Sequence, residues 1–210
     1  MISIHNVCLS YGERHVLCHI TQHIGPYDFI VLTGPNGGGK TTLLRLLAGL
    51  LPPTCGRIDR RKGAAMGYLP QYRRVDRRFP STVADMVLTG MECRKRPWQR
   101  FSAAHRAQAA EALQLFGLTD LADRPISDLS GGQWQRTLLA RAFAPDPDIL
   151  LLDEPETHLD EVWCARLYAA LAARSSHAAI VMVSHHNDPC ADIPFRRFWH
   201  VEKGTLLNEE

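Results

Sequence analysis

A glycine-rich turn that joins an apolar run to a leucine-rich run constrains this chain more than any other feature. The apolar run at residues 29–33 predicts a buried strand, and the leucines within residues 41–51 are spaced for a helix. Pro52 and Pro53 are expected to end that helix, because proline lacks an amide donor and disfavours helix in the residue before it. Strand, turn and helix in this order predict an α/β fold.

The turn, residues 34–41, reads GPNGGGKT and satisfies the pattern G-x-x-x-x-G-K-[ST]. Its glycines let successive backbone amides converge on phosphate oxygens, and the start of the following helix adds partial positive charge. Lys40 would hold the β and γ phosphates of a nucleotide, and Thr41 would offer its hydroxyl to Mg²⁺. The alternative is a chance glycine-rich turn. The flanking strand and helix favour a phosphate-binding loop.

Two carboxylates follow a second apolar run. Residues 149–154 read ILLLDE, which places Asp153 and Glu154 at the end of a buried strand, the edge of an α/β sheet where ligands bind. Asp153 would anchor the Mg²⁺ shell, and Glu154 would act on an attacking water as general base or orienting group. The alternative is a solvated strand end before Pro155.

The remaining patterns predict a sheet with a helical insert. Strands are predicted at residues 64–69, 148–152 and 178–183, and their alternation with helical segments indicates a largely parallel sheet covered on both faces. A turn is predicted at residues 54–56 and a hairpin at residues 195–207, turning at 203–204. Residues 75–129 have helical patterns, with N-caps at Thr82 and Ser102 and a stop at Gly117.

Composition sets the outer limits. With 210 residues, 45% of them hydrophobic, the chain is expected to form one domain, 1–210. It has neither an apolar stretch of about 18 residues nor a secretory signal pattern at its start, which predicts a cytoplasmic location. Its six cysteines are scattered without a CxxC pair, so we expect reduced, structural thiols.

A five-residue motif identifies a family. Leu129, Ser130, Gly131, Gly132 and Gln133 spell LSGGQ. Together with the loop upstream and ILLLDEP downstream, this motif makes the chain resemble the ATP-binding cassette (ABC) ATPases over nearly its whole length. The resemblance implies an α/β P-loop NTPase fold, with a core at about 1–74 and 130–210, a helical subdomain at about 75–129 and a small antiparallel β part. It also implies ATP as substrate and Mg²⁺ as cofactor.

The LSGGQ motif is itself an anion site, because Ser130 is a good N-cap and two glycines leave bare amides at the start of a helix over residues 133–144. The resemblance implies that this signature acts in trans, closing over ATP bound by a partner's loop in a head-to-tail dimer. The partner would be a second copy or another ABC subunit. The ATP-binding residues so implied are Tyr11, Gly34, Pro35, Asn36, Gly37, Gly38, Gly39, Lys40, Thr41 and Thr42.

Other family positions match one at a time. Tyr11 matches the aromatic residue that stacks on adenine, and Gln71, in GYLPQ, matches the glutamine that contacts Mg²⁺ and the water. His185 matches the histidine that contacts the γ-phosphate. Asp160 matches the aspartate of the loop that communicates across the dimer, but His158 stands where the family has a small alanine.

Two alternatives remain at the histidines. The neighbouring His186 could take the phosphate-contacting position of His185. The same two histidines with Cys190 could form a metal cluster, although the spacing provides no fourth ligand.

A longer resemblance concerns the cargo. The segment GYLPQYRRVDRRFPSTVADMVLTGM is similar to the manganese, zinc and iron-chelate uptake ATPases of the family. It implies separate transmembrane permease subunits, a substrate-binding protein in the wider system and a position on the inner face of the cell membrane. The rival is a soluble ABC ATPase acting on ribosomes or nucleic acid, which usually has two cassettes or a coiled-coil insert. A regulator without turnover is a further rival, and nucleic acid is not the expected partner.

The formal net charge of +2 conceals an uneven distribution. Residues 73–106 hold nine bases and three acids, a net of +6, so the rest of the chain has a net of −4. The alternatives are a solvated helical face and a surface that meets the permease and anionic headgroups.

Overall fold

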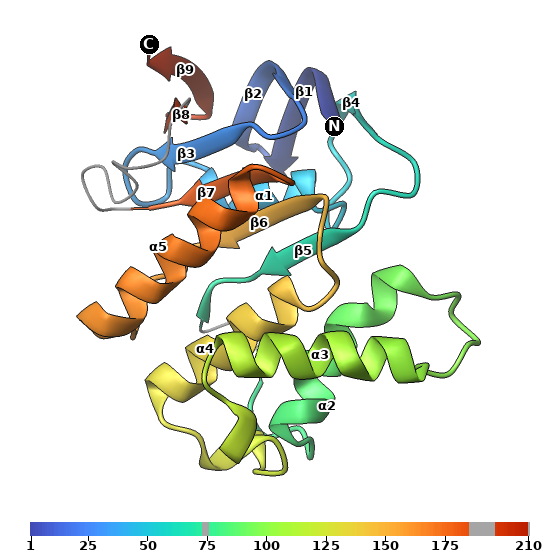
Figure 1. Cartoon of the computed structure of the whole chain (residues 1–210). Helices are drawn as coiled ribbons and strands as arrows, with labels where there is room; N and C mark the ends of the chain where they lie inside the picture. Colours follow the sequence, from blue (N-terminus) through green and yellow to red (C-terminus); the bar gives the residue numbers. More distant parts are fainter. Residues whose placement is uncertain (73–75, 185–195, 210) are drawn as a thin grey trace.

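The computed structural model describes residues 1–72, 76–184 and 196–209, which form two sheets and a group of helices (Figure 1). The larger sheet has six strands in the order β5-β6-β7-β3-β8-β9. The smaller sheet has three antiparallel strands in the order β2-β1-β4. This arrangement confirms the predicted fold class of a mostly parallel sheet, a small antiparallel part and a helical part.

The larger sheet is parallel from β5 to β8. Its strands are β3 (Phe29–Thr33), β5 (Met66–Leu69), β6 (Ile149–Asp153), β7 (Ala179–Val183), β8 (Arg196–Glu202) and β9 (Thr205–Glu209). All five residues of β6 and all five of β7 are buried, as expected for central strands covered on both faces. The apolar runs therefore predicted these strands correctly, and β8 and β9 form the predicted antiparallel hairpin.

Two hydrophobic clusters lie on opposite faces of this sheet. Alternate side chains of one strand enter different clusters: Leu150 and Leu152 join the cluster that contains the helical part, and Leu151 joins the other. The second cluster also holds the leucines of α1 (Lys40–Leu47) and the inward side chains of the small sheet. The site-bearing strand ends are thus held from both sides.

The small sheet consists of β1 (Ile2–Tyr11), β2 (Arg14–Ile24) and β4 (Cys55–Arg60). Residues 54–56, predicted as a turn, instead lead into β4, an edge strand whose side chains are mostly exposed and show no apolar alternation. In β1 the alternation is interrupted by register shifts between Ile4 and Val7, where Asn6 has a φ of 48°. Irregular pairing of this kind removes the period of two on which strand prediction depends.

Helix α1 ends earlier than the two prolines predict. Its last residue is Leu47, and Gly49 has a φ of 74°. The Gly49 amide donates to the Leu46 carbonyl at 3.0 Å and the Leu50 amide to the Arg45 carbonyl at 2.9 Å, the pattern of a Schellman motif. The glycine therefore ends the helix, and Pro52 and Pro53 lie beyond it.

The helical part contains α2 (Val83–Leu88), α3 (Ala103–Leu115) and α4 (Gly131–Phe143), grouped on one side in Figure 1. Short 3₁₀ helices at Thr89–Arg94, Thr119–Leu121 and Ile126–Asp128 connect them. Thr82 and Ser102 both form capping boxes, as predicted. Helix α4 begins at Gly131, two residues before the predicted start, and α5 (Glu161–Ser175) follows β6.

None of the helices in the described ranges combines the length and apolar character that crossing a membrane requires. Cys8, Cys18, Cys55, Cys93 and Cys164 are free thiols.

Candidate functional site

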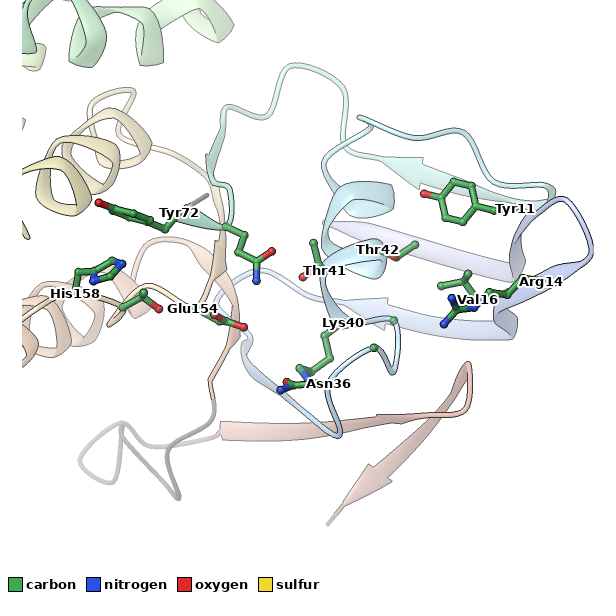
Figure 2. A pocket seen from close by; sticks show the side chains of 14 residues that line it. Tyr11, Arg14, Val16, Asn36, Lys40, Thr41, Thr42, Tyr72, Glu154 and His158 are labelled. Carbon is green, nitrogen blue, oxygen red and sulfur yellow. The ribbon is translucent and has the colours of Figure 1, made fainter. Parts of the chain in front are cut away.

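An elongated cavity of about 920 Å³ lies where the large sheet, the glycine-rich turn and the small sheet meet (Figure 2). Figure 2 places Tyr11, Arg14 and Val16 at one end, Glu154, Tyr72 and His158 at the other, and Lys40 between them. The predicted residues that line the cavity are Tyr11, Asn36, Gly37, Gly39, Lys40, Thr41, Thr42, Gln71 and Glu154.

The glycine-rich turn keeps its shape by packing closely against β8. A Cβ atom added at Gly34 would lie 2.2 Å from the Val201 carbonyl oxygen, and one at Gly38 would lie 2.7 Å from the same oxygen. Gly34 also has a φ of 125°. These two glycines and Pro35 do not line the cavity, so their part is to shape the turn.

Lys40 is the first residue of α1 and reaches back over the turn. Its Nζ donates to the carbonyl oxygens of Gly34 at 2.7 Å and Pro35 at 3.0 Å, and the residue is only 6% exposed. Burial lowers the pKa of Lys40, while the negative charges of Glu154 and Asp153 act against that lowering. A buried ammonium group beside a row of glycine amides is suited to bind a polyphosphate.

The two predicted carboxylates have different surroundings. Asp153 ends β6 and is 1% exposed, whereas Glu154 lines the cavity. Glu154 has a φ of 53°, and its amide donates to the Val183 carbonyl at 3.2 Å, which ties the turn after β6 to the end of β7. One carboxylate is therefore held inside the protein and does not line the cavity, and the other faces the open space.

Side chains from α4 and from the end of β7 hold the loop after Glu154 by hydrogen bonds. The buried Gln135 of α4 donates its Nε2 to the Pro155 carbonyl at 2.9 Å. Ser184, at the end of β7, donates its hydroxyl to the Glu156 carboxylate at 2.6 Å. Both contacts restrain the backbone that carries Glu154.

A ring contact joins the two segments that carry Gln71 and Glu154. Tyr72 follows Gln71, and its ring centroid lies 4.2 Å from that of His158 at an interplanar angle of 55°. His158 has a φ of 63°, and both rings line the cavity. The contact therefore connects the end of the β5 segment with the loop after β6.

The LSGGQ residues lie outside the cavity lining. The Ser130 hydroxyl accepts from the Gln133 amide at 3.3 Å, and the Gln133 side chain accepts from the Ser130 amide at 2.9 Å, forming a capping box at the start of α4. Leu129 is buried, and its carbonyl accepts from the Arg77 guanidinium. Gly131 and Gly132 begin the helix beside the cavity without lining it: a Cβ added at Gly131 would lie 3.4 Å from the Tyr72 hydroxyl, and one at Gly132 would lie 3.0 Å from the His158 carbonyl oxygen.

Asp160 does not line the cavity either. Its carboxylate accepts from the Trp163 amide at 2.9 Å and so caps α5. His185, with the alternative at His186 and the proposed cluster partner Cys190, lies outside the described residues.

Five cavity residues are additional to those that the sequence analysis assigned: Arg14, Val16, Tyr72, Thr157 and His158. Their motifs offered a signal, because Arg14 and Val16 follow Tyr11, Tyr72 follows Gln71, and the other two follow Glu154 closely. Spacing alone did not show which side chains turn toward the cavity.

The donor groups suit Mg²⁺. A threonine hydroxyl at Thr41, an amide at Gln71 and a carboxylate at Asp153 offer the hard oxygen ligands that this ion takes in small numbers while it keeps several waters. In the described ranges no group of three or more histidine, cysteine or acidic side chains could hold a metal ion. Thr41 and Gln71 line the cavity, and the buried Asp153 directly precedes Glu154, which also lines it.

Comparison with known proteins adds three findings. The family model described as ABC transporter matches residues 8–157. The zinc import ATP-binding protein ZnuC of Cereibacter sphaeroides is 39% identical over 187 residues, covering 88% of this chain and 72% of that protein. A Chlamydia trachomatis protein named "Probable metal transport system ATP-binding protein" is 40% identical over 190 residues, covering 87% of this chain and 80% of its own length.

Among solved structures, the dimeric structure of MJ0796, a bacterial ABC transporter cassette, has a TM-score of 0.85 to this chain. It is 26% identical and covers 100% of this chain and 98% of that one.

Proposed function

Because the chain belongs to the ABC transporter family and is an ATPase subunit of that kind, we propose that it hydrolyses ATP in composite sites to drive metal import. Zinc is the first candidate for the cargo. The observation that carries the proposal is the cavity that joins Tyr11, the Lys40 turn, Gln71 and Glu154 in one line.

Each end of the cavity suits one end of ATP. The Tyr11 ring is 52% exposed and lies with Val16 at one end, where an adenine base could stack. Lys40 and the amides of the turn lie in the middle, where phosphates would accept their hydrogen bonds. At the other end Glu154 faces the place that the γ-phosphate would reach.

Hydrolysis then needs a water held in line with the γ-phosphate. The Glu154 carboxylate would accept a proton or a hydrogen bond from that water, and the Gln71 amide would orient it. When bound, Mg²⁺ would neutralise charge on the β and γ phosphates. Lys40 and the turn amides would stabilise the charge that develops on the transferred group.

The position of the LSGGQ residues supports a dimer with shared sites. The helix start at Gly131 and Gly132 presents first-turn amides, which have no partner within an α-helix, and it does not line the chain's own cavity. In a head-to-tail dimer each signature would close over the nucleotide of the other subunit. The solved structure of the similar cassette MJ0796 is dimeric, which supports a dimer.

The names of the relatives support the cargo, since both concern metal or zinc transport. The chain would couple to separate membrane subunits on the inner face of the membrane. The ribosomal or nucleic-acid alternative would be favoured by a long coiled-coil insert. The described ranges contain no such insert.

One experiment tests both chemistry and cargo. Uptake of radioactive zinc is measured in native cells without this chain, and in the same cells supplied with wild type, Glu154→Gln or the control Glu161→Gln. Glu161 is exposed in the first turn of α5, and its replacement by glutamine removes the same negative charge as Glu154→Gln. We expect Glu154→Gln to abolish uptake and to lower hydrolysis by the purified protein about 100-fold or more, while Glu161→Gln behaves as wild type.

The outcomes separate two failures. Zinc uptake that does not depend on this chain would contradict the cargo, whatever the hydrolysis rate. Undiminished ATP hydrolysis by Glu154→Gln would contradict the assigned role of that carboxylate.

A further inference from the structure

Two cysteines face each other across the small sheet. Cys8 of β1 and Cys55 of β4 are direct partners in the antiparallel register, although 46 residues separate them in the sequence. The Thr54 amide donates to the Cys8 carbonyl at 2.8 Å, so the chain entering β4 is anchored beside Cys8. This pairing is independent of the nucleotide cavity, which neither cysteine lines.

The two strands approach closely at this pair. A Cβ atom added at Gly56, which follows Cys55 and has a φ of 75°, would lie 2.3 Å from the Asn6 carbonyl oxygen. The thiol of Cys55 is itself 3.8 Å from that oxygen. Glycine at this position therefore allows β1 and β4 to come closer together than a residue with a side chain would permit.

The surroundings make the two thiols chemically unequal. The neighbouring Cys55 thiol and a hydrogen bond from the His19 amide, at 3.3 Å, lower the pKa of Cys8, while the Cys55 thiol itself donates to the Asn6 carbonyl. The contact with Cys8 in turn raises the pKa of Cys55. His19 Nδ1 also lies 3.9 Å from the Cys8 sulfur. A cysteine with a lowered pKa whose sulfur accepts a backbone hydrogen bond, next to a cysteine with a raised pKa, is the arrangement expected of an attacking and a resolving cysteine.

Solvent can reach the pair. Cys55 is exposed on the edge strand β4, and Cys8 is partly exposed on the central strand β1 of the small sheet. By contrast, burial raises the pKa of Cys93, and burial also raises that of Cys164. Among these four cysteines, Cys8 is the one whose pKa is lowered.

We propose that Cys8 and Cys55 form a reversible oxidation site that a peroxide converts to an intramolecular disulfide. The Cys8 thiolate attacks one peroxide oxygen, the O–O bond breaks, and Cys8 becomes a sulfenic acid as hydroxide leaves and takes up a proton to form water. The Cys55 sulfur then attacks the Cys8 sulfur, the S–S bond forms, and the second water leaves. Two electrons pass from the thiols to the peroxide, and a dithiol reductant reverses the change.

The disulfide would link the strand that carries Tyr11 to the segment that follows α1. Tyr11 is three residues beyond Cys8, and α1 begins with Lys40. Oxidation would therefore restrict the motion of β1 relative to β4, next to the end of the cavity where adenine is expected to bind.

The test uses the full-length purified chain and hydrogen peroxide. After exposure, remaining thiols are alkylated, and the protein is digested without reduction and mapped by mass spectrometry. We expect a linked peptide pair containing Cys8 and Cys55, an intact mass lower by two hydrogens, and loss of the link after dithiothreitol. Cys8→Ser and Cys55→Ser should each abolish it, whereas Cys18→Ser and Cys164→Ser should retain it.

A second measurement tests which sulfur attacks. In Cys55→Ser, a dimedone probe should label Cys8 as a trapped sulfenic acid. A link from Cys8 to Cys18, a link between two molecules, or labelling of other cysteines ahead of Cys8 would each overturn the proposal. Because the wild-type map needs no substitution, the proposal stays testable even if a serine variant folds poorly.

Discussion

At the scale of single residues, the contact between Tyr72 and His158 joins two cavity-lining segments, and no sequence motif predicts it. Tyr72 follows Gln71 directly, and His158 belongs to the loop that begins at Glu154. Gly131 lies against the same pair, since a Cβ added there would be 3.4 Å from the Tyr72 hydroxyl and 3.7 Å from the His158 ring. The histidine at the position where the family has an alanine therefore packs against Tyr72 and Gly131.

We predict that His158→Ala lowers kcat about threefold to tenfold, because a ring pair is worth about 0.5–1.5 kcal/mol and positions two catalytic segments. KM for ATP should change by less than about twofold, since neither the turn nor Tyr11 contacts these rings. Steady-state hydrolysis measures both constants. His158→Phe should restore kcat, and His177→Ala, at an exposed position, should have no effect. Equal rates for His158→Ala and wild type would contradict a positioning role.

At the scale of elements, helix starts were the most predictable feature of this chain. Thr82, Ser102 and Ser130 all cap the helices that follow them, and each forms a capping box. Caps depend on residues within one turn of each other, so sequence spacing contains them. The end of α1 was predicted wrongly, because it depends on Gly49. Strand β4 was missed and a turn predicted at its start, because the strand depends on pairing with β1.

The two serine caps provide a matched test of the LSGGQ segment. Ser130→Ala and Ser102→Ala should each lower the free energy of unfolding by about 1 kcal/mol, measured by urea denaturation. Only Ser130→Ala should also lower ATP hydrolysis, by about tenfold or more, because Ser130 would contact a partner's nucleotide. If the two variants lose equal activity, Ser130 has only a structural role.

At the scale of the whole molecule, the charge surplus of residues 73–106 is only partly available to a partner. Arg77 donates to the carbonyls of Leu129 and, at 3.4 Å, of Ile126. Arg94 donates to the Pro145 carbonyl at 2.8 Å, and Lys95 pairs with Glu92 at 2.8 Å. Several of these bases therefore hold the protein together, and a reversal at Arg77 would damage the signature segment rather than test a surface.

A cleaner test uses the exposed bases. Reversing Arg96, Arg100 and Arg106 to Glu should weaken binding to vesicles that contain phosphatidylglycerol by about tenfold or more, since each base near an anionic surface is worth about 1 kcal/mol. Vesicle sedimentation measures this. Reversal of three other exposed bases, Arg57 within β4 and Arg61 and Lys62 just after it, makes the same charge change elsewhere. Equal loss in both sets would mean that only net charge matters, and no loss would exclude this surface.

The shared sites of the dimer have their own test. Lys40→Ala should lose ATP binding, and Gly131→Asp, where a Cβ has only ordinary contacts, should place a negative charge at the signature. Each variant alone should be inactive. Mixing them should restore about a quarter of the wild-type rate, because half of the dimers are mixed and each has one intact site. No recovery after exchange of subunits would contradict sites formed in trans.

What the sequence determined by itself is local chemistry. The glycine-rich turn, the carboxylates after β6 and the helix caps depend on residues a few positions apart, and the fold class follows from their alternation with apolar runs. What only the tertiary structure decided is every contact between distant segments: Tyr72 with His158, Arg77 with Leu129, and Cys8 with Cys55. Such contacts depend on strand register and helix packing, and these arise only when the whole core is assembled.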